Sequence, residues 1–279
     1  MTKTTMLDNQ SLDAFLIHDP YNMRYLSKFR GGEGVLYISK DKRILITDSR
    51  YIEAAGRESD FEVMECTRNH SVKDILRELI TSEQVKRLGY EDEAMLCKTF
   101  HEYQKELPMV SEWIPLGSEV KKLRQIKTEE ELEYLRHAES IGDKAFSKIL
   151  ELLRPGVTER EIQMELEYWM MKYGAEGTSF STIVASGVHS SMPHAIPTDK
   201  KIEYGDFVTM DFGCRYMGYC SDMTRTVVVG KANDKQKEIY QLVLKANRVT
   251  ESLLHPGMAC WEVDKIARDI ITDAGYGEY

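Results

Sequence analysis

Two aspartates in the second half of this 279-residue chain have the side-chain type and the spacing for metal or proton chemistry. Asp211 and Asp222 lie in two strand-like segments, 207–213 and 219–226, joined by a turn that contains a glycine. If the turn has four residues, 215–218, with glycine in the left-handed conformation, Asp211 pairs directly with Asp222. The sequence therefore predicts two carboxylates side by side on a β-hairpin.

The same register places Thr209 opposite Thr224, and alternation along a strand puts all four side chains on one face. Carboxylates directly opposite have β-carbons about 5 Å apart, where like charges destabilise the pair. A shared proton or a bound cation relieves this repulsion, and oxygen ligands suit divalent ions such as Mn²⁺, Zn²⁺ or Co²⁺. Thr209 and Thr224 could hydrogen-bond the ligating carboxylates. Two solvated aspartates on an exposed face are the alternative at this point.

The elements that must position this hairpin are mainly helical. Apolar residues recur with the helical period after Thr128, which forms a capping-box pattern with Glu131, and Thr158 begins a second helix with the same pattern. We expect helices over 128–154 and from 158, an irregular stretch over 174–201, strands over 207–212 and 219–229, and helices over 234–254 and 261–274.

The first 110 residues instead alternate strand and helix signals, which is typical of a small α/β unit. The periodicity breaks near residues 115–125, so we place a domain boundary there and expect domains over 1–122 and 123–279. The expected strands are 14–17, 35–38, 44–47, 61–64 and 85–90, and the expected helices are 51–56 and 71–80.

The composition excludes several classes of protein. With 37 basic and 46 acidic residues the net charge is −9, which argues against nucleic-acid binding through a basic face. No apolar run approaches the roughly 20 residues of a membrane span, and the N-terminal segment lacks the apolar core of a secretory signal. Five cysteines without CxxC spacing indicate reduced thiols in the cytoplasm, with a Cys214–Cys220 bridge as the alternative.

Several segments together resemble the proline-peptidase branch of the pita-bread metallopeptidases, which contains Xaa-Pro aminopeptidase and prolidase. The segments that resemble the catalytic domain are Met192-Pro193-His194, 205–213 and 219–226. The segments 22–29 and 45–51 resemble the family's N-terminal domain, and 123–131 resembles its linker helix.

The resemblance implies an α+β fold, with a small creatinase-like α/β domain followed by a pita-bread catalytic domain. It also implies two divalent metal ions held by two aspartates, one histidine and two glutamates, and Asp211 and Asp222 match the aspartates. His194 matches the histidine that steadies the substrate and the tetrahedral intermediate. The implied activity is hydrolysis of Xaa-Pro bonds in proline-containing peptides by metal-activated water, with manganese ahead of cobalt or zinc. A homodimer is the implied assembly.

The sequence departs from the family's pattern at its C-terminal end. After residues 274–279 the family continues with a glycine-rich segment that bears the histidine ligand and then with the two glutamates, and these three ligands have no counterpart here. We therefore expect an incomplete pita-bread domain, truncated at its C-terminus, that is inactive alone. The alternative is a non-catalytic pita-bread module that binds a peptide or protein. Creatinase-like amidinohydrolysis is less consistent with the aspartate pair, because that reaction would not need it.

Overall fold

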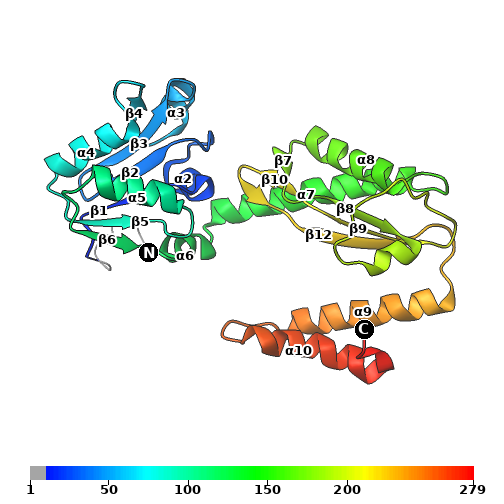
Figure 1. The fold of residues 1–279 in the computed structure, drawn as a ribbon. Coiled ribbons are helices and arrows are strands. Elements are labelled where there is room, and N and C mark those ends of the chain that lie inside the picture. The colour runs from blue at the N-terminus through cyan, green and yellow to red at the C-terminus, as the bar shows by residue number, and fades with distance from the viewer. Residues whose placement is uncertain (1–10) are drawn as a thin grey trace. The chain divides into compact units, whose positions relative to one another are not determined.

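The computed structural model describes residues 11–279, in which the chain divides into two compact units between Leu132 and Glu133 (Figure 1). The boundary expected between residues 122 and 123 falls inside helix α6 (Glu119–Gln125). Val120 and Leu123 of α6 are buried in the core of the first unit, and for this reason the first unit extends past that helix.

The first unit is built on a six-stranded sheet in the order β4-β3-β2-β1-β5-β6. The pairs β1–β2 and β2–β3 are antiparallel, whereas β3–β4, β1–β5 and β5–β6 are parallel. The strands are β1 (Ala14–Ile17), β2 (Val35–Ser39), β3 (Arg43–Asp48), β4 (Glu62–Cys66), β5 (Arg87–Tyr90) and β6 (Glu112–Pro115).

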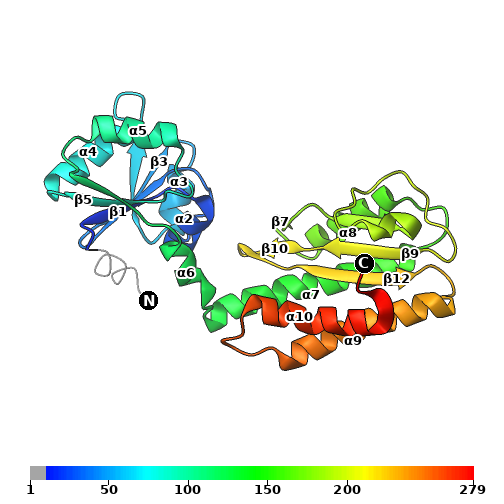
Figure 2. The same ribbon diagram turned by 60° about the horizontal axis from the view of Figure 1, so that its bottom comes forward.

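Helices cover both faces of this sheet, which explains why its central strands are continuous apolar runs. In β1, Phe15 and Ile17 pack with α2, α3 and α6, and Ala14 and Leu16 pack with α4 and α5. Figure 2 shows α4 and α5 on one side of the sheet and α6 on the other. The remaining helices of this unit are α2 (Pro20–Ser27), α3 (Ile52–Glu58), α4 (Val72–Ser82) and α5 (Cys97–Glu106).

Elements of this unit with clear apolar periodicity or a capping pattern were predicted from the sequence, and elements without such patterns were missed. The helix expected from Ser71 is confirmed as α4, which Ser71 caps through a capping box with Asp74. The helices α2 and α5 and the strand β6 were not predicted. The linker helix expected over 123–131 is divided between the end of α6 and the start of α7, with non-helical residues 126–128 between them. In α5 only Tyr103 is buried, so its sequence carries little apolar periodicity.

A buried carboxylate joins the start of α2 to the end of β5. The Glu91 side chain accepts hydrogen bonds from the backbone N–H of His18 at 2.6 Å, from that of Asp19 at 2.8 Å and from the Asn22 amide at 2.7 Å. The Asn22 Oδ1 in turn accepts a hydrogen bond from Arg124 at 2.9 Å. Burial raises the pKa of the Glu91 carboxyl, while these hydrogen bonds oppose that rise.

Replacing Glu91 with glutamine is expected to lower the free energy of unfolding by about 1–3 kcal/mol. The NH₂ group of the glutamine would replace an acceptor oxygen and leave an N–H donor without a partner. Urea unfolding followed by circular dichroism measures the change. The matched control is Glu93→Gln, which removes an exposed ion pair to Lys121 and should cost less than about 1 kcal/mol. Equal losses in the two variants would contradict this role of Glu91.

The second unit contains two three-stranded antiparallel sheets, in the orders β12-β9-β8 and β11-β10-β7. Two of these strands lie in the stretch over 174–201 that was expected to be irregular. The strands are β7 (Gly177–Thr178), β8 (Ile183–Ser186), β9 (Phe207–Phe212), β10 (Cys214–Tyr216), β11 (Tyr219–Cys220) and β12 (Met223–Val228).

Two helices bury one face of β9. Val208, Met210 and Phe212 are fully buried with the apolar residues of α7 (Glu129–Leu152) and α8 (Glu159–Lys172). Gly142 permits the close approach of α7, because a β-carbon there would lie 2.9 Å from the Met223 side chain. The capping boxes expected at the starts of both helices are confirmed. The opposite face of β9 is therefore the one that can present polar side chains.

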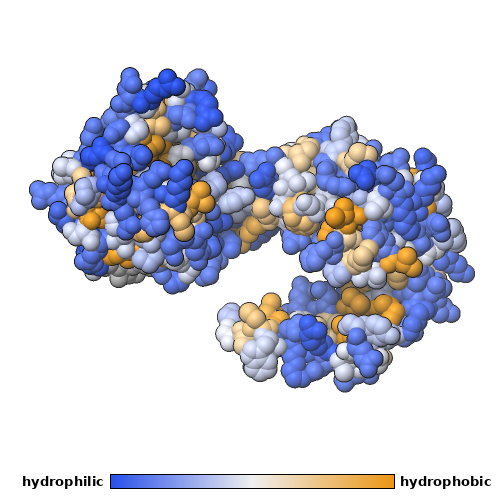
Figure 3. All heavy atoms as spheres, viewed as in Figure 1, coloured by the Kyte–Doolittle hydropathy of each residue, from blue (hydrophilic) through white to orange (hydrophobic). Residues whose placement is uncertain are grey.

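The last two long helices, α9 (Asp234–Leu253) and α10 (Cys260–Ile271), pack against each other (Figures 1 and 2). Figure 3 shows apolar residues on the surface of this helix pair, where Val243, Leu254 and Trp261 are more than half exposed. Within residues 11–279, the structure contains no helix with the length and apolar character that a membrane span requires.

Candidate functional site

The turn between the two aspartate-bearing segments has two residues instead of the four expected. Met217 and Gly218 both adopt left-handed conformations, with φ of 50° and 85°, and Tyr216 pairs with Tyr219 across the turn. Arg215, which was expected in the loop, belongs to β10. The prediction was wrong because it assigned the left-handed conformation to the glycine alone, and left-handed conformations at both central positions give the two-residue turn that matches strand twist.

This turn displaces the strand register by two residues. Asp211 lies opposite Thr224, not opposite Asp222, and Thr209 lies opposite Thr226, not opposite Thr224. The two aspartates are therefore diagonal neighbours, with β-carbons about 7 Å apart in place of the expected 5 Å. Their mutual repulsion is weaker than that of the directly opposed pair that the sequence predicted.

Asp211 and Asp222 still lie on the same face of the strand pair, because a register shift of two residues leaves each side chain on its original face. The buried residues of β9 are Val208, Met210 and Phe212, so Asp211 points away from α7 and α8. Asp222 is exposed and lies just before β12 begins. It is two residues before Thr224, the partner of Asp211, and so its side chain is on the same face as that of Asp211. The strand pair thus presents two carboxylates on its uncovered face.

Hydrogen bonds distinguish the two threonines that were expected to support the carboxylates. The Thr224 hydroxyl donates to Asp211 Oδ1 at 3.0 Å and so fixes the orientation of this carboxylate. The Thr209 hydroxyl lies 3.1 Å from that of Thr226 and bonds across the strand pair instead. The backbone N–H of Asp222 donates to Glu139 Oε1 of α7 at 3.3 Å.

The chemistry of these donors fits a hard divalent cation, since carboxylate oxygens are ligands that Mn²⁺ accepts and one of them is already oriented. Within residues 11–279, however, no three His, Cys, Asp or Glu side chains are arranged as a group that could hold a metal ion. Asp211 and Asp222 thus supply two carboxylates on one face, and no third side chain of these types joins them within this range.

His194 lies in the loop that follows a short 3₁₀ helix, η1 (Gly187–Ser191), after β8. Its side chain is exposed, and it follows Pro193 in a turn where the N–H of Ala195 donates to the carbonyl of Met192 at 3.2 Å. The loop begins at β8, which pairs with β9 and places Ile183 opposite Asp211. The same small sheet thus connects the histidine loop and the aspartate strand.

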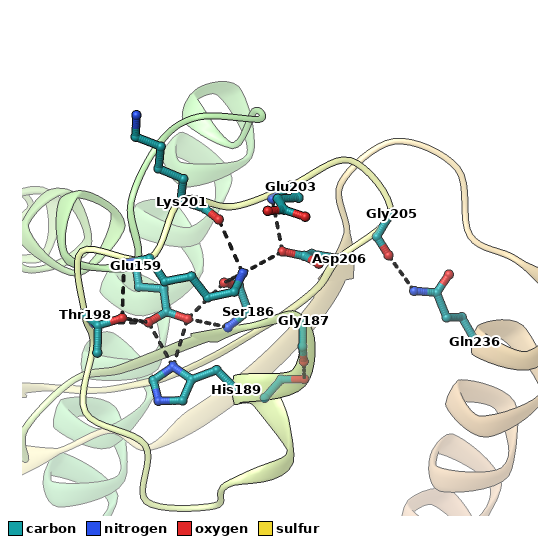
Figure 4. Close-up of polar contacts among 12 residues, drawn as sticks. Glu159, Ser186, Gly187, His189, Thr198, Lys201, Glu203, Gly205, Asp206 and Gln236 are labelled. Carbon is teal, nitrogen blue, oxygen red and sulfur yellow. Dashed lines mark hydrogen bonds and ion pairs between the residues drawn. The ribbon is translucent and has the colours of Figure 1, made fainter.

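A buried glutamate that was not predicted from the sequence as a site residue holds this loop (Figure 4). Glu159, the first residue of α8, is fully buried, and its carboxylate accepts hydrogen bonds from both ends of the loop. His189 Nδ1 lies 2.9 Å from both carboxylate oxygens. The neighbouring Thr158–Glu161 capping box marks the start of the helix, but no sequence signal distinguishes Glu159 from an exposed first-turn glutamate.

The environment of Glu159 stabilises its ionised form. Burial raises the pKa of this carboxyl, but hydrogen bonds from His189, Thr198 and Ser186 outweigh burial, and the net effect lowers the pKa below the usual 4.5. A carboxyl whose pKa is depressed on folding contributes stability above its unfolded pKa and loses it as the pH falls through the folded value.

Acidification is therefore expected to remove the stability advantage of the wild type over Glu159→Gln. The difference in melting temperature should be full at pH 7 and should shrink below about pH 4.5 as the carboxylate is protonated. Calorimetry of both proteins between pH 7 and pH 3 measures the difference. A gap that stays constant over this range would contradict an ionised Glu159.

An ion pair extends the Glu159 cluster toward β9. The Lys200 Nζ donates to Ser186 Oγ at 2.8 Å and to Asp206 Oδ2 at 2.9 Å. Asp206 directly precedes β9. The end of the histidine loop is thereby tied to the start of the strand that carries Asp211.

Two family models together match nearly the whole chain. Residues 133–279 match the model of metallopeptidase family M24, and residues 4–126 match the creatinase/prolidase N-terminal domain. The first of these matches covers the aspartate strands and the histidine loop.

Relatives and solved structures agree with these matches. A Xaa-Pro dipeptidase from Pyrococcus furiosus is 38% identical over 98% of this chain and 76% of its own length. The structure of a Xaa-Pro dipeptidase from Bacillus anthracis is similar with a TM-score of 0.92 and 39% identity, over 99% of this chain and 77% of that one. An X-Pro aminopeptidase structure from Thermotoga maritima has a TM-score of 0.92 and 36% identity, over 99% of this chain and 79% of that one.

Proposed function

This chain belongs to metallopeptidase family M24, with a creatinase/prolidase N-terminal domain, and on that premise we propose that it hydrolyses Xaa-Pro peptide bonds with the help of divalent metal ions. The α+β fold expected from the sequence, a creatinase-like α/β domain followed by a pita-bread domain, is confirmed by these matches and by the similarity to dipeptidase structures. The relatives named Xaa-Pro dipeptidase support the proposed substrate class.

The observation that carries the proposal is the pair of carboxylates on the uncovered face of β9 and β12. Asp211 and Asp222 are the residues that would ligate metal, and Thr224 orients the first of them at 3.0 Å. When bound, divalent ions supply Lewis-acid polarisation of the scissile carbonyl and lower the pKa of water. Manganese is our first choice, with cobalt or zinc as alternatives, because the two ligands are carboxylates.

We assign the substrate-binding role to His194. Its exposed imidazole on the loop after η1 can donate a hydrogen bond to a peptide carbonyl or to the oxyanion that develops from it. This role requires that the loop hold the ring in one place before the substrate arrives.

A peptide-binding module without catalysis is the second candidate. One observation favours it: within residues 11–279 the aspartates have no third His, Cys, Asp or Glu close enough to complete a metal site. Such a module would hold a proline-containing peptide without any requirement for metal.

Incubation of the chain with an Xaa-Pro dipeptide separates the two candidates. A peptidase should release proline only when Mn²⁺ is added, and should lose this activity in the chelator EDTA and in the variant Asp211→Asn. Such turnover would also show that the expectation of a chain inactive alone is wrong. The matching Xaa-Ala dipeptide is the substrate control. Dipeptide binding that calorimetry finds equally tight with and without Mn²⁺, and equally tight in Asp211→Asn, would favour the binding module.

A homodimer stays a prediction that comes from the family resemblance, and a cytoplasmic location stays a prediction that comes from the cysteine pattern. Sedimentation equilibrium of the purified chain tests the first, with twice the sequence mass of 32.2 kDa as the expected result.

A further inference from the structure

We propose that Glu159 is a positioning residue that anchors both ends of the loop bearing His194 and so holds this histidine ready for substrate. The inference rests on the proposed function, which gives His194 its role. Glu159 itself is fully buried and touches no reacting group, so it acts only through the loop.

The first anchor lies at the end of β8, where the loop begins. Glu159 Oε1 accepts hydrogen bonds from the backbone N–H of Ser186 at 2.8 Å and from its hydroxyl at 2.9 Å. His189, three residues further along, donates from Nδ1 to the same carboxylate at 2.9 Å. These contacts fix the chain before it reaches His194.

The second anchor lies after His194. Glu159 Oε2 accepts hydrogen bonds from the backbone N–H of Thr198 at 3.1 Å and from its hydroxyl at 2.8 Å. Two backbone hydrogen bonds continue this contact, from Arg160 to the Thr198 carbonyl and from Glu159 to the Lys200 carbonyl, both at 3.1 Å. One carboxylate therefore closes the loop at both ends (Figure 4).

The loop between the anchors has little packing of its own at its tip. Val188 and Ile196 are 89% and 79% exposed, and His194 is also exposed, while Ala195 and Pro197 are buried. Exposed side chains add few contacts that could restrict a loop, so the hydrogen bonds at its ends carry much of the restriction.

Only a carboxylate can satisfy this set of donors. Five N–H or O–H groups from Ser186, His189 and Thr198 point at the two oxygens of Glu159, and an ionised carboxylate is acceptor-only on both. A glutamine amide has the same shape but turns one of the two positions into a donor. It would therefore release one end of the loop.

Three variants of the full 279-residue chain test the proposal: Glu159→Gln, the conservative Glu159→Asp, and Glu161→Gln as the matched control. Glu161 lies in the same helical turn, but among residues 11–279 it accepts hydrogen bonds only from Thr158, at the start of its own helix. The first readout is amide hydrogen exchange at Ser186 and Thr198, which we expect to become at least tenfold faster in Glu159→Gln and unchanged in Glu161→Gln.

The second readout follows His194 itself by nuclear magnetic resonance. The ring signal of His194 should shift or broaden in Glu159→Gln, while that of His255, between α9 and α10, stays in place. Glu159→Asp should restore part of the wild-type signal. A purely structural contribution to stability would leave the His194 ring signal where it is in the folded protein. An unchanged His194 signal in Glu159→Gln would overturn the proposal.

The third readout separates this inference from the proposed function. In the dipeptide assay, or in dipeptide binding, Glu159→Gln should lose about 100-fold in kcat/KM or affinity, since small displacements of positioned groups have effects of this size. If His194→Ala leaves kcat/KM and the affinity for the dipeptide unchanged, the role assigned to His194 is wrong. In that case amide hydrogen exchange and the His194 ring signal alone decide whether Glu159 anchors the loop. If Glu159→Gln matches the wild type in both hydrogen exchange and the His194 ring signal, Glu159 does not anchor the loop.

Discussion

Replacing Phe212 with alanine is expected to lower the free energy of unfolding of the second unit by about 3–5 kcal/mol, the usual cost of removing a buried aromatic ring. Phe212 is fully buried between β9 and α7, where its ring stacks with Phe146 at a centroid distance of 6.3 Å. The ring also lies near Gly142, which has no side chain that could move into the gap.

Urea unfolding followed by circular dichroism measures the loss, and hydrogen exchange of the β9 amides assigns it to the second unit. The matched control is Phe207→Ala at the start of the same strand, where the ring is only partly buried and the cost should be clearly smaller. Phe212 directly follows Asp211, so we also expect weaker manganese binding in Phe212→Ala. Losses of equal size in the two phenylalanine variants would contradict the burial argument.

Replacing Asp211 with asparagine is expected to lower the affinity for Mn²⁺ by more than about 100-fold, because the substitution removes a charged ligand, whereas loss of an outer partner typically costs 10–100-fold. Titration calorimetry of the 279-residue chain measures the affinity. Asp222→Asn should have a similar effect, and His194→Ala should leave metal affinity unchanged, since we assign that histidine to the substrate.

The two threonines provide a sharper comparison. Thr224→Val removes the hydroxyl that donates to Asp211 and should weaken Mn²⁺ binding by about tenfold. Thr209→Val removes a hydroxyl that bonds to Thr226 and should change metal affinity much less. If wild-type affinity persists in Asp211→Asn, or if both threonine variants behave alike, the proposed metal site is wrong.

The register of the aspartate strands illustrates where sequence reasoning stops. Alternation along a strand is a local property, so the common face of Asp211 and Asp222 could be predicted without knowing the partner strand. The exact pairing depends on whether Met217 accepts a left-handed conformation, which most residues avoid. Tyr216 and Tyr219 pair across this turn, and that pairing moved Asp222 to a diagonal position.

Local signals also explain which elements were predicted. Capping boxes at Ser71 and Thr158 involve residues three apart, so the starts of α4 and α8 could be predicted from sequence. The strand β8 was missed because it has only four residues within a stretch rich in glycine, serine and proline. It exists because β9 pairs with it along its whole length.

The amino-acid sequence by itself determined the starts of α4, α7 and α8, the alternation that gives the aspartates a common face, and the family to which they belong, because each depends on residues close together in the chain. Only the tertiary structure decided that Thr224 and not Thr209 supports Asp211, and that Glu159 holds the histidine loop. Glu159 contacts residues 27 to 39 positions away. Such contacts form only when distant segments fold together, and no local pattern around a first-turn glutamate records which donors will surround it.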